Sequence, residues 1–451
     1  MRFSQYRERL KMTKERLDGL YMLALGCVVF FSLGAILAST SPIQMVDFRV
    51  LYYPARCLVQ HCDPYNEGEL LRFSAADQGG RPEDVAKARQ IMRYIYLPTA
   101  FSFSVPFALL PWGPAHLLWM ALIAGSLIFA SFLIWSLGAD HAPIISGLLV
   151  GFLLANSELL VITGNMAGIA ISLCIVAVWC FLRDRFAAVG VLCLAISLAT
   201  KPHDAGLVWL FFLLAGGVYR KRAWQTLLVT LAISLPAVLW VWRVAPLWMQ
   251  ELHSNIVEYA ALGNLNDPGL TSSGAHGLGM LVSLQSIIGV FWDNPRVYNT
   301  ASYLICAPLI LGWMLATLRS RSSPARARLA LAAIAALTML PVYHRQQDTK
   351  LLLLTVPACA ILWAEGGRIG RLALAVTVAG FVLTGDIPWA IFFSVIGKLP
   401  LPANALTSKM LIGAQIFPIP LILLVMGIFY LWIYVRRDPG AVILADRKLT
   451  D

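Results

Sequence analysis

The residues best suited to chemistry are charged side chains at the ends of apolar stretches. Asp47 is the first of them, in a segment (residues 41–49) that directly follows the first apolar run. A carboxylate this close to a membrane surface is costly unless it is paired, hydrated or used in a reaction. In a reaction it could act as a general base that takes the proton of a hydroxyl group. The alternative is an ordinary interfacial acid that caps the following helix.

Two later clusters supply cations at comparable places. Lys201 opens the segment Lys201-Pro-His-Asp204, and Arg345 belongs to His344-Arg-Gln-Gln-Asp-Thr-Lys350. Lys201 either snorkels to the interface or binds a phosphate, and His344 is either a satisfied interfacial histidine or part of a site. Arg345 and Lys350 bind either lipid head groups or a substrate phosphate. The remaining candidate substrate contacts are Arg49, Tyr53, Tyr65, Asn165 and His203.

Composition identifies the class of protein that must position these residues. The chain has 451 residues, of which 59% are hydrophobic and 13% are charged. Soluble globular proteins carry about 25% charged residues. The low charged fraction, together with long apolar runs, therefore predicts an integral membrane protein. The formal net charge of +11 reflects basic cytoplasmic loops, so we expect no nucleic acid partner.

Apolar runs recur along the whole chain and predict an all-α polytopic membrane protein with about 12 transmembrane helices. The first run covers about residues 20–39 and is interpreted as an uncleaved anchor. Basic residues occur in every second connection, which places both termini in the cytoplasm. The other runs lie near 116–137, 143–162, 164–182, 187–200, 205–219, 224–242, 299–318, 327–342, 350–365, 369–385 and 412–435.

This topology predicts one large domain with short cytoplasmic ends. Residues 1–19 form a basic cytoplasmic N-terminus, residues 20–435 a single transmembrane domain, and residues 436–451 a cytoplasmic tail. Two long outer loops are expected, at about 40–115 and 243–298.

The polar residues that interrupt the apolar runs lie at the outer ends of the predicted helices. Residues 96–111 contain three prolines and are expected to form a broken segment that stays on the outer face. Residues 82–95 are expected to form a helix in the interface plane. Transporters place coupling charges near the bilayer midplane instead. The pattern favours an enzyme that acts on a lipid head group over a flippase or secondary transporter, or a non-catalytic scaffold.

Two side-chain pairings are expected or left open. Glu158, near the end of an apolar run, is expected to pair with Lys201. Cys57 and Cys62 lie in an outer loop, where a disulfide is possible, but free thiols are favoured because five residues along one helix point the side chains apart. The eight cysteines show no metal-binding spacing. No metal site and no cofactor are predicted, although a divalent ion is left open.

The same inventory fits one type of transfer reaction. A sugar attached to a lipid through one phosphate already carries a good leaving group. Its transfer needs a base for the acceptor hydroxyl and cations for the departing phosphate, but not a pair of catalytic carboxylates. Direct displacement at the anomeric carbon would invert its configuration.

Several short motifs, in this order, resemble one family. They are Asp47-Phe, Asp63-Pro-Tyr65, Tyr96-Leu-Pro98, Gly164-Asn165, Ala199-Thr-Lys201-Pro202 and Pro341-Val-Tyr-His344. Their order and the predicted topology resemble glycosyltransferase family 87, the polyprenyl-phosphate-mannose-dependent mannosyltransferases of the GT-C superfamily. The resemblance implies a GT-C-like bundle with juxtamembrane helices on the outer face. By position, Asp47 resembles the catalytic aspartate, His344 a catalytic histidine, and Lys201 the lysine of the family's Lys-Pro motif.

The resemblance also implies partners and a location. The expected donor is a polyprenyl-phosphate sugar with a mannose-like hexose, and the expected acceptor is a glycolipid or glycan among membrane lipids. The reaction would take place on the outer face of a bacterial plasma membrane, with Asp47 and His344 as catalytic residues. Lys201 and Arg345 would bind the donor phosphate.

Overall fold

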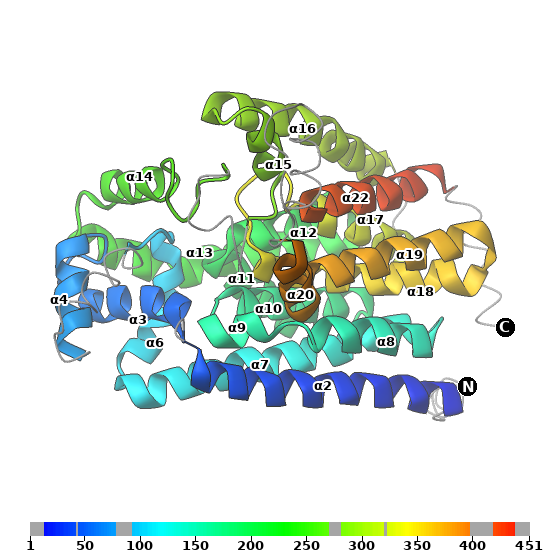
Figure 1. The fold of residues 1–451 in the computed structure, drawn as a ribbon, viewed down its shortest axis with the longest axis horizontal. Coiled ribbons are helices and arrows are strands. Elements are labelled where there is room, and N and C mark those ends of the chain that lie inside the picture. Colours follow the sequence, from blue (N-terminus) through cyan, green and yellow to red (C-terminus); the bar gives the residue numbers. More distant parts are fainter. Residues whose placement is uncertain are drawn as a thin grey trace.

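The protein is an elongated bundle of helices (Figure 1). Apart from one antiparallel bridge between Leu281 and Arg345, the described part of the chain consists of helices and loops, so the predicted all-helical polytopic class is confirmed. The computed structural model describes residues 13–41, 44–77, 93–269, 281–319, 323–396 and 418–437.

Seven helices in the described ranges are long and apolar enough to cross a membrane, where α8 and α9 count as one. The other predicted runs form shorter helices, several of them buried along most of their length. The long helices are α2 (Lys14–Thr40), α7 (Trp112–Gly138), α8 (Pro143–Leu154) with α9 (Glu158–Thr163), α13 (Gly217–Val244), α16 (Pro295–Arg319), α19 (Gly367–Thr384) and α22 (Pro418–Arg436). The shorter ones are α10 (Ala167–Leu182), α11 (Ala187–Thr200), α12 (Pro202–Leu214), α17 (Pro324–Leu337), and the 3-10 helix η2 (Gln346–Thr355) that continues into α18 (Val356–Glu365).

Glycines allow α2 and α8 to pack with their backbones close together. The sequence Gly147-Leu-Leu-Val-Gly151 has the small-residue spacing that brings membrane helices into contact. A Cβ atom on Gly151 would lie 2.6 Å from the carbonyl oxygen of Met22 on α2. The two helices therefore depend on the absence of side chains at this crossing.

Replacing Gly151 with valine is expected to destabilise the protein by about 1–3 kcal/mol, because the added atoms cannot fit against α2. Thermal unfolding in detergent measures the effect. The matched control is Gly125→Val on α7, where a Cβ atom would meet no atom within 4 Å beyond the nearby backbone of its own helix. Equal unfolding temperatures for the two variants would contradict this packing.

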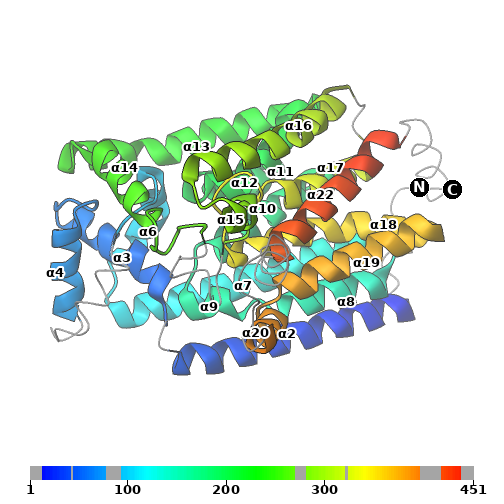
Figure 2. The ribbon, with the colours of Figure 1, turned by 45° about the horizontal axis from the view of Figure 1, so that its top comes forward.

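Helix α2 begins and α22 ends at the same end of the bundle (Figures 1 and 2). Basic residues of separate helices meet near the start of α2. Asp140 accepts ion pairs there from Arg16 at 3.2 Å and Arg183 at 2.7 Å, and Arg328 lies at 4.0 Å. The predicted basic connections therefore share one end. Helix α2 begins at Lys14 rather than near residue 20, so part of the predicted N-terminal lead belongs to the first long helix.

The opposite end carries a layer of short helices, on the left in Figure 1. Residues 96–111 form the broken segment that was predicted, because α7 starts a new helix after Pro111 and the eight residues of α6 are too few to cross a bilayer. Most of the helix predicted at 82–95 lies outside the described residues. The layer consists of α3 (Val46–Val59), α4 (Glu67–Asp77), η1 (Pro98–Ala100), α6 (Phe101–Ala108) and α14 (Trp248–Tyr259).

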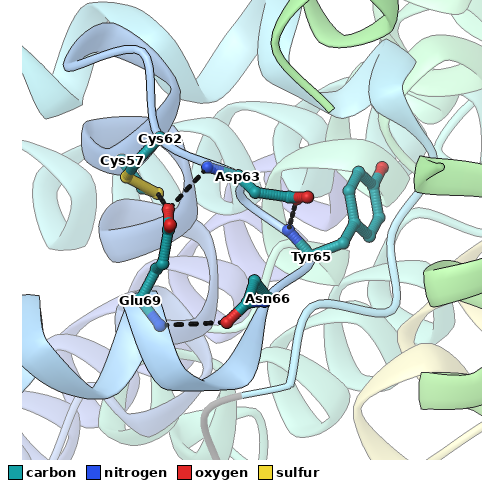
Figure 3. Close-up of a disulfide and its surroundings, with 6 residues drawn as sticks. All are labelled: Cys57, Cys62, Asp63, Tyr65, Asn66 and Glu69. Carbon is teal, nitrogen blue, oxygen red and sulfur yellow. Dashed lines mark hydrogen bonds between the residues drawn. A yellow bond between two sulfur atoms is a disulfide. The ribbon is translucent and has the colours of Figure 1, made fainter. Parts of the chain in front are cut away.

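Cys57 and Cys62 form a disulfide, so the expectation of free thiols was wrong (Figure 3). That expectation assumed one continuous helix, but α3 ends at Val59 and His61 has a φ of 60°, which turns the chain back. The Cα atoms of the two cysteines are thereby brought to 5.0 Å. The bridge lies beside Glu69, whose carboxylate accepts a hydrogen bond from the backbone N–H of Asp63 at 2.8 Å.

Candidate active site

A cavity of about 500 Å³ lies among the loops next to this layer of short helices. Four of the residues predicted from sequence line it: Asn165, Lys201, His203 and Arg345. Among the residues that the structure describes, the lining consists of Ile95, Tyr96, Asn165, Lys201, His203, Ile256, Ala260, Asn266, Pro268, Leu281, Ser283, Gln285, Tyr298, Asn299, Val342, Tyr343, Arg345 and Asp348.

One wall of the cavity consists of two loops that are hydrogen-bonded to each other. The N–H of Val282 donates to the carbonyl of His344 at 3.0 Å, and the N–H of Leu284 donates to that of Leu340 at 3.0 Å. The side chain of Gln285 donates to the carbonyl of Pro341 at 2.7 Å. Residues 340–345 are therefore fixed in place before η2 begins.

Lys201 occupies the turn between α11 and α12, where Pro202 starts the second helix. Its ammonium group lies 3.3 Å from Asp204 and forms an ion pair with Asp348 on η2. Asp348 also accepts a hydrogen bond from the N–H of Arg345 at 2.8 Å, which caps the start of η2. Lys201 faces the cavity, but much of its charge is balanced by two carboxylates.

The predicted pairing of Glu158 with Lys201 is wrong, because Lys201 is paired with Asp204 and Asp348. A different buried lysine, Lys350, lies near Glu158 and pairs with Asp386 at 3.0 Å. Lys350 is completely buried, so it does not bind lipid head groups at the surface.

Arg345 is oriented by three neighbouring groups. Its Nε donates to the hydroxyl of Tyr343 at 2.6 Å, and its Nη2 donates to the side chain of Asn266 at 2.6 Å and to the carbonyl of Leu265 at 3.2 Å. Burial lowers the pKa of Arg345, but Tyr343 and Asp47 more than offset it, so the pKa is raised above its ordinary value. Arg345 is therefore a fixed cation in the cavity wall, within the electrostatic reach of Asp47.

Asp47 lies in the first turn of α3 and is connected to the cavity through Asn165. Its Oδ2 accepts a hydrogen bond from the Asn165 side chain at 2.8 Å, and Asn165 Oδ1 accepts one from the N–H of Ala167 at the start of α10. The capping residue of α3 is Met45, so Asp47 does not fill the N-cap position of the alternative interpretation.

The turn before Asn165 requires glycine. Gly164 has a φ of 68°, a left-handed conformation that favours glycine, and a Cβ atom there would lie 2.8 Å from Cβ of Phe48 on α3. The absence of that atom lets α3 approach the turn and brings Asp47 to Asn165.

Tyr96, which lines the cavity, interacts electrostatically with both Asp47 and Lys201. Burial raises the pKa of its hydroxyl, while Lys201 lowers it and Asp47 raises it further. Two residues far apart in the sequence, Asp47 and Lys201, therefore both act on one residue of the cavity wall. Lys201 lines the cavity, whereas Asp47 is not part of its lining.

His344 is fully buried and lies behind the cavity rather than in its lining. Its Nε2 is 3.4 Å from Oδ1 of Asp204, and its Nδ1 is 3.1 Å from the carbonyl oxygen of Val342. The ring of His203, which does line the cavity, stands edge-on to it with 4.9 Å between the ring centroids. His344 can therefore act on the cavity only through Asp204 or His203.

The other predicted substrate contacts support the cavity instead of lining it. Tyr53 is 2% exposed and stacks on Trp112, over which Arg49 also lies. Tyr65 is equally buried, and its hydroxyl donates to the carbonyl of Tyr96 at 3.0 Å. These side chains pack between the short helices and the start of α7, and they hold α3 and residue 96 in position.

Sequence reasoning missed three polar groups of the site. In the sequence, Asp204 and Asp348 stand out only as neighbours of Lys201 and Arg345, and no pattern marks Tyr343. The signal for Asp348 was its place in a polar run before an apolar stretch, but its partner Lys201 is 147 positions away. Such a pairing becomes visible only in the folded chain.

The arrangement defines a polytopic membrane protein with a cavity that is lined by charged, polar and apolar side chains. The model of glycosyltransferase family 87 matches residues 94–342, more than half of the chain. The chain therefore belongs to glycosyltransferase family 87 and is a membrane glycosyltransferase. Asn165, Lys201 and His203 lie within the matched range, whereas Asp47 and Arg345 lie outside it. No curated protein and no solved structure matches the chain.

Proposed function

We propose that the protein transfers a mannose-like hexose from a polyprenyl-phosphate donor to a hydroxyl of a glycolipid or glycan acceptor. The observation that supports this most is the hydrogen bond of 2.8 Å from Asn165, a residue of the cavity lining, to the carboxylate of Asp47, with the fixed cation Arg345 in the same lining. Lys201 adds a second cation to the same cavity. Transfer with a lipid phosphate as the leaving group requires this combination, a base for the acceptor hydroxyl and fixed cations for the departing phosphate.

The proposed reaction has one displacement step. Asp47 takes the proton of the acceptor hydroxyl, while the oxygen of that hydroxyl forms a bond to the anomeric carbon. The bond from that carbon to the phosphate oxygen breaks, and its electron pair leaves with the phosphate, so the configuration is inverted. Arg345 is the main phosphate ligand in this scheme, because two carboxylates already balance Lys201.

We place the reaction on the outer face of a bacterial plasma membrane, with both termini in the cytoplasm. The end of the bundle that carries Arg16, Arg183 and Arg328 matches the basic side of membrane proteins. The cavity adjoins the opposite end, where the polyprenyl tail would remain in the bilayer. No cofactor is required for the displacement itself.

The test uses purified protein in lipid nanodiscs with a lipid extract as the acceptor. Polyprenyl-phosphate-[¹⁴C]mannose should give a labelled product that is stable to mild acid, whereas a labelled nucleotide sugar should give none. Label that crosses a proteoliposome membrane without forming a product would support a transporter instead. Transfer from the nucleotide sugar alone would reject the proposed donor.

A further inference from the structure

Three side chains converge behind the cavity with atoms suited to binding a metal ion. Nε2 of His344 lies 3.4 Å from Oδ1 of Asp204, and Nε2 of His203 lies 3.8 Å from the same oxygen. These three atoms are buried, and none has a hydrogen-bond partner among the described residues. Leaving such atoms unsatisfied is costly, so their convergence calls for an explanation.

The second nitrogen of His344 fixes the orientation of its ring. Nδ1 lies 3.1 Å from the carbonyl oxygen of Val342, which can only accept, so Nδ1 carries the proton. In the neutral ring, Nε2 then directs a lone pair toward the Asp204 carboxylate, and this repulsion is removed either by a proton on Nε2 or by a metal ion between the two atoms. Histidines that bind metals commonly donate their other N–H to a backbone carbonyl in this way.

The spacing of the donor atoms also fits a metal ion. Zinc bonds to histidine nitrogen and carboxylate oxygen are about 2.0–2.2 Å, which puts neighbouring ligands of a tetrahedral site roughly 3.4 Å apart. Two of the three separations are 3.4 Å and 3.8 Å, and all three donor atoms lie within 4.8 Å of one another. Two imidazoles and one carboxylate form a ligand set typical of zinc and related divalent ions.

The charges around Asp204 leave room for a further cation. Its Oδ2 is 3.3 Å from the ammonium of Lys201, so Oδ1 is the oxygen left for another partner. Lys201 is also paired with Asp348, so one cation is shared by two carboxylates in a buried place. When both histidines are neutral, one negative charge of this group lacks a cation.

We propose that His203, Asp204 and His344 bind one divalent transition-metal ion, with zinc as the best-fitting example. His203 lines the cavity, so an ion bound here would lie next to the cavity. An ion there would add a positive charge next to Lys201 for an oxyanion in the cavity. The identification of this oxyanion with the donor phosphate rests on the proposed function, whereas the binding of the metal is independent of that function.

The experiment measures metal binding to the full-length protein, purified without a histidine tag and dialysed against EDTA. Titration with Zn²⁺ should show one saturable site, and Co²⁺ should give the visible absorption of a tetrahedral ion. His203→Ala should weaken binding by at least about tenfold. Asp204→Asn should have a similar effect, and its folding is checked by size-exclusion elution and thermal unfolding.

His116→Ala is the matched control, because His116 on α7 also places Nδ1 near a backbone carbonyl but belongs to no group of three or more potential metal ligands in the described part of the chain. Its Zn²⁺ affinity should equal that of the wild type. Absence of a saturable site in the wild type would overturn the proposal, as would unchanged binding by His203→Ala, whose half-buried side chain is the least disruptive to remove. If the protein binds the metal but transfers no sugar, the metal site is upheld and the proposed function is rejected. If it transfers sugar but binds no metal, the proposed function is upheld and the metal site is rejected.

Discussion

Asp47→Asn is expected to lower the rate of sugar transfer by about 10²–10⁴-fold, the usual contribution of a general base. An asparagine oxygen can still accept the hydrogen bond that Asn165 donates at 2.8 Å, so the contact between α3 and the turn at residue 165 is kept. The amide cannot take the proton of the acceptor hydroxyl. Initial rates with the polyprenyl-phosphate donor, and donor affinity measured separately, check the result.

The expected signature is a large fall in turnover with little change in donor affinity. Glu67→Gln is the control. Glu67 is a carboxylate at the start of α4, in the layer of short helices, where it pairs with Arg93 and does not line the cavity. Its transfer rate should remain close to that of the wild type. A folded Asp47→Asn protein with full activity would show that another group acts as the base.

Lys201→Met is expected to destabilise the protein by about 3–5 kcal/mol, the cost of removing one partner of a buried ion pair. Lys201 is 5% exposed, and its loss leaves the carboxylates of Asp204 and Asp348 without their ammonium partner. Because Asp348 also caps η2, the cavity wall at Arg345 should loosen as well. Thermal unfolding in detergent measures the stability, and the transfer assay measures the activity.

Lys221→Met is the matched control, since Lys221 is exposed near the start of α13. It should unfold at the wild-type temperature. The double variant Lys201→Met/Asp348→Asn should regain part of the lost stability, because it removes one of the two uncompensated charges. A single Lys201→Met variant as stable as the wild type would mean that the ion pairs contribute nothing, and that Lys201 is free to bind phosphate alone.

The membrane class and the order of helices could be predicted because they depend on local patterns. Apolar runs mark the long helices, and basic connections mark one end of the bundle. The breaks within the predicted helices were harder to predict. The run predicted at 350–365 begins within the buried 3-10 helix η2. Asp348 caps the start of η2 and pairs with Lys201, which lies 147 positions earlier in the chain.

The site was predictable where a residue type was unusual for its position. Lys201, Asn165 and Arg345 interrupt apolar surroundings, and all three line the cavity. Tyr53 and Tyr65 gave no such signal, because tyrosines that support a wall and tyrosines that face a substrate have the same pattern in sequence. The disulfide was missed because the end of α3 depends on the turn at residue 61, which the spacing of the cysteines does not reveal.

The most direct measurement is an experimental structure with a non-transferable phosphonate analogue of the polyprenyl-phosphate sugar. The account predicts that the phosphonate lies against Arg345, on the side of the cavity that holds Lys201. The anomeric carbon should face Asp47, with space between them for an acceptor hydroxyl. An analogue bound outside this cavity, or with its sugar turned away from Asp47, would contradict the proposed reaction.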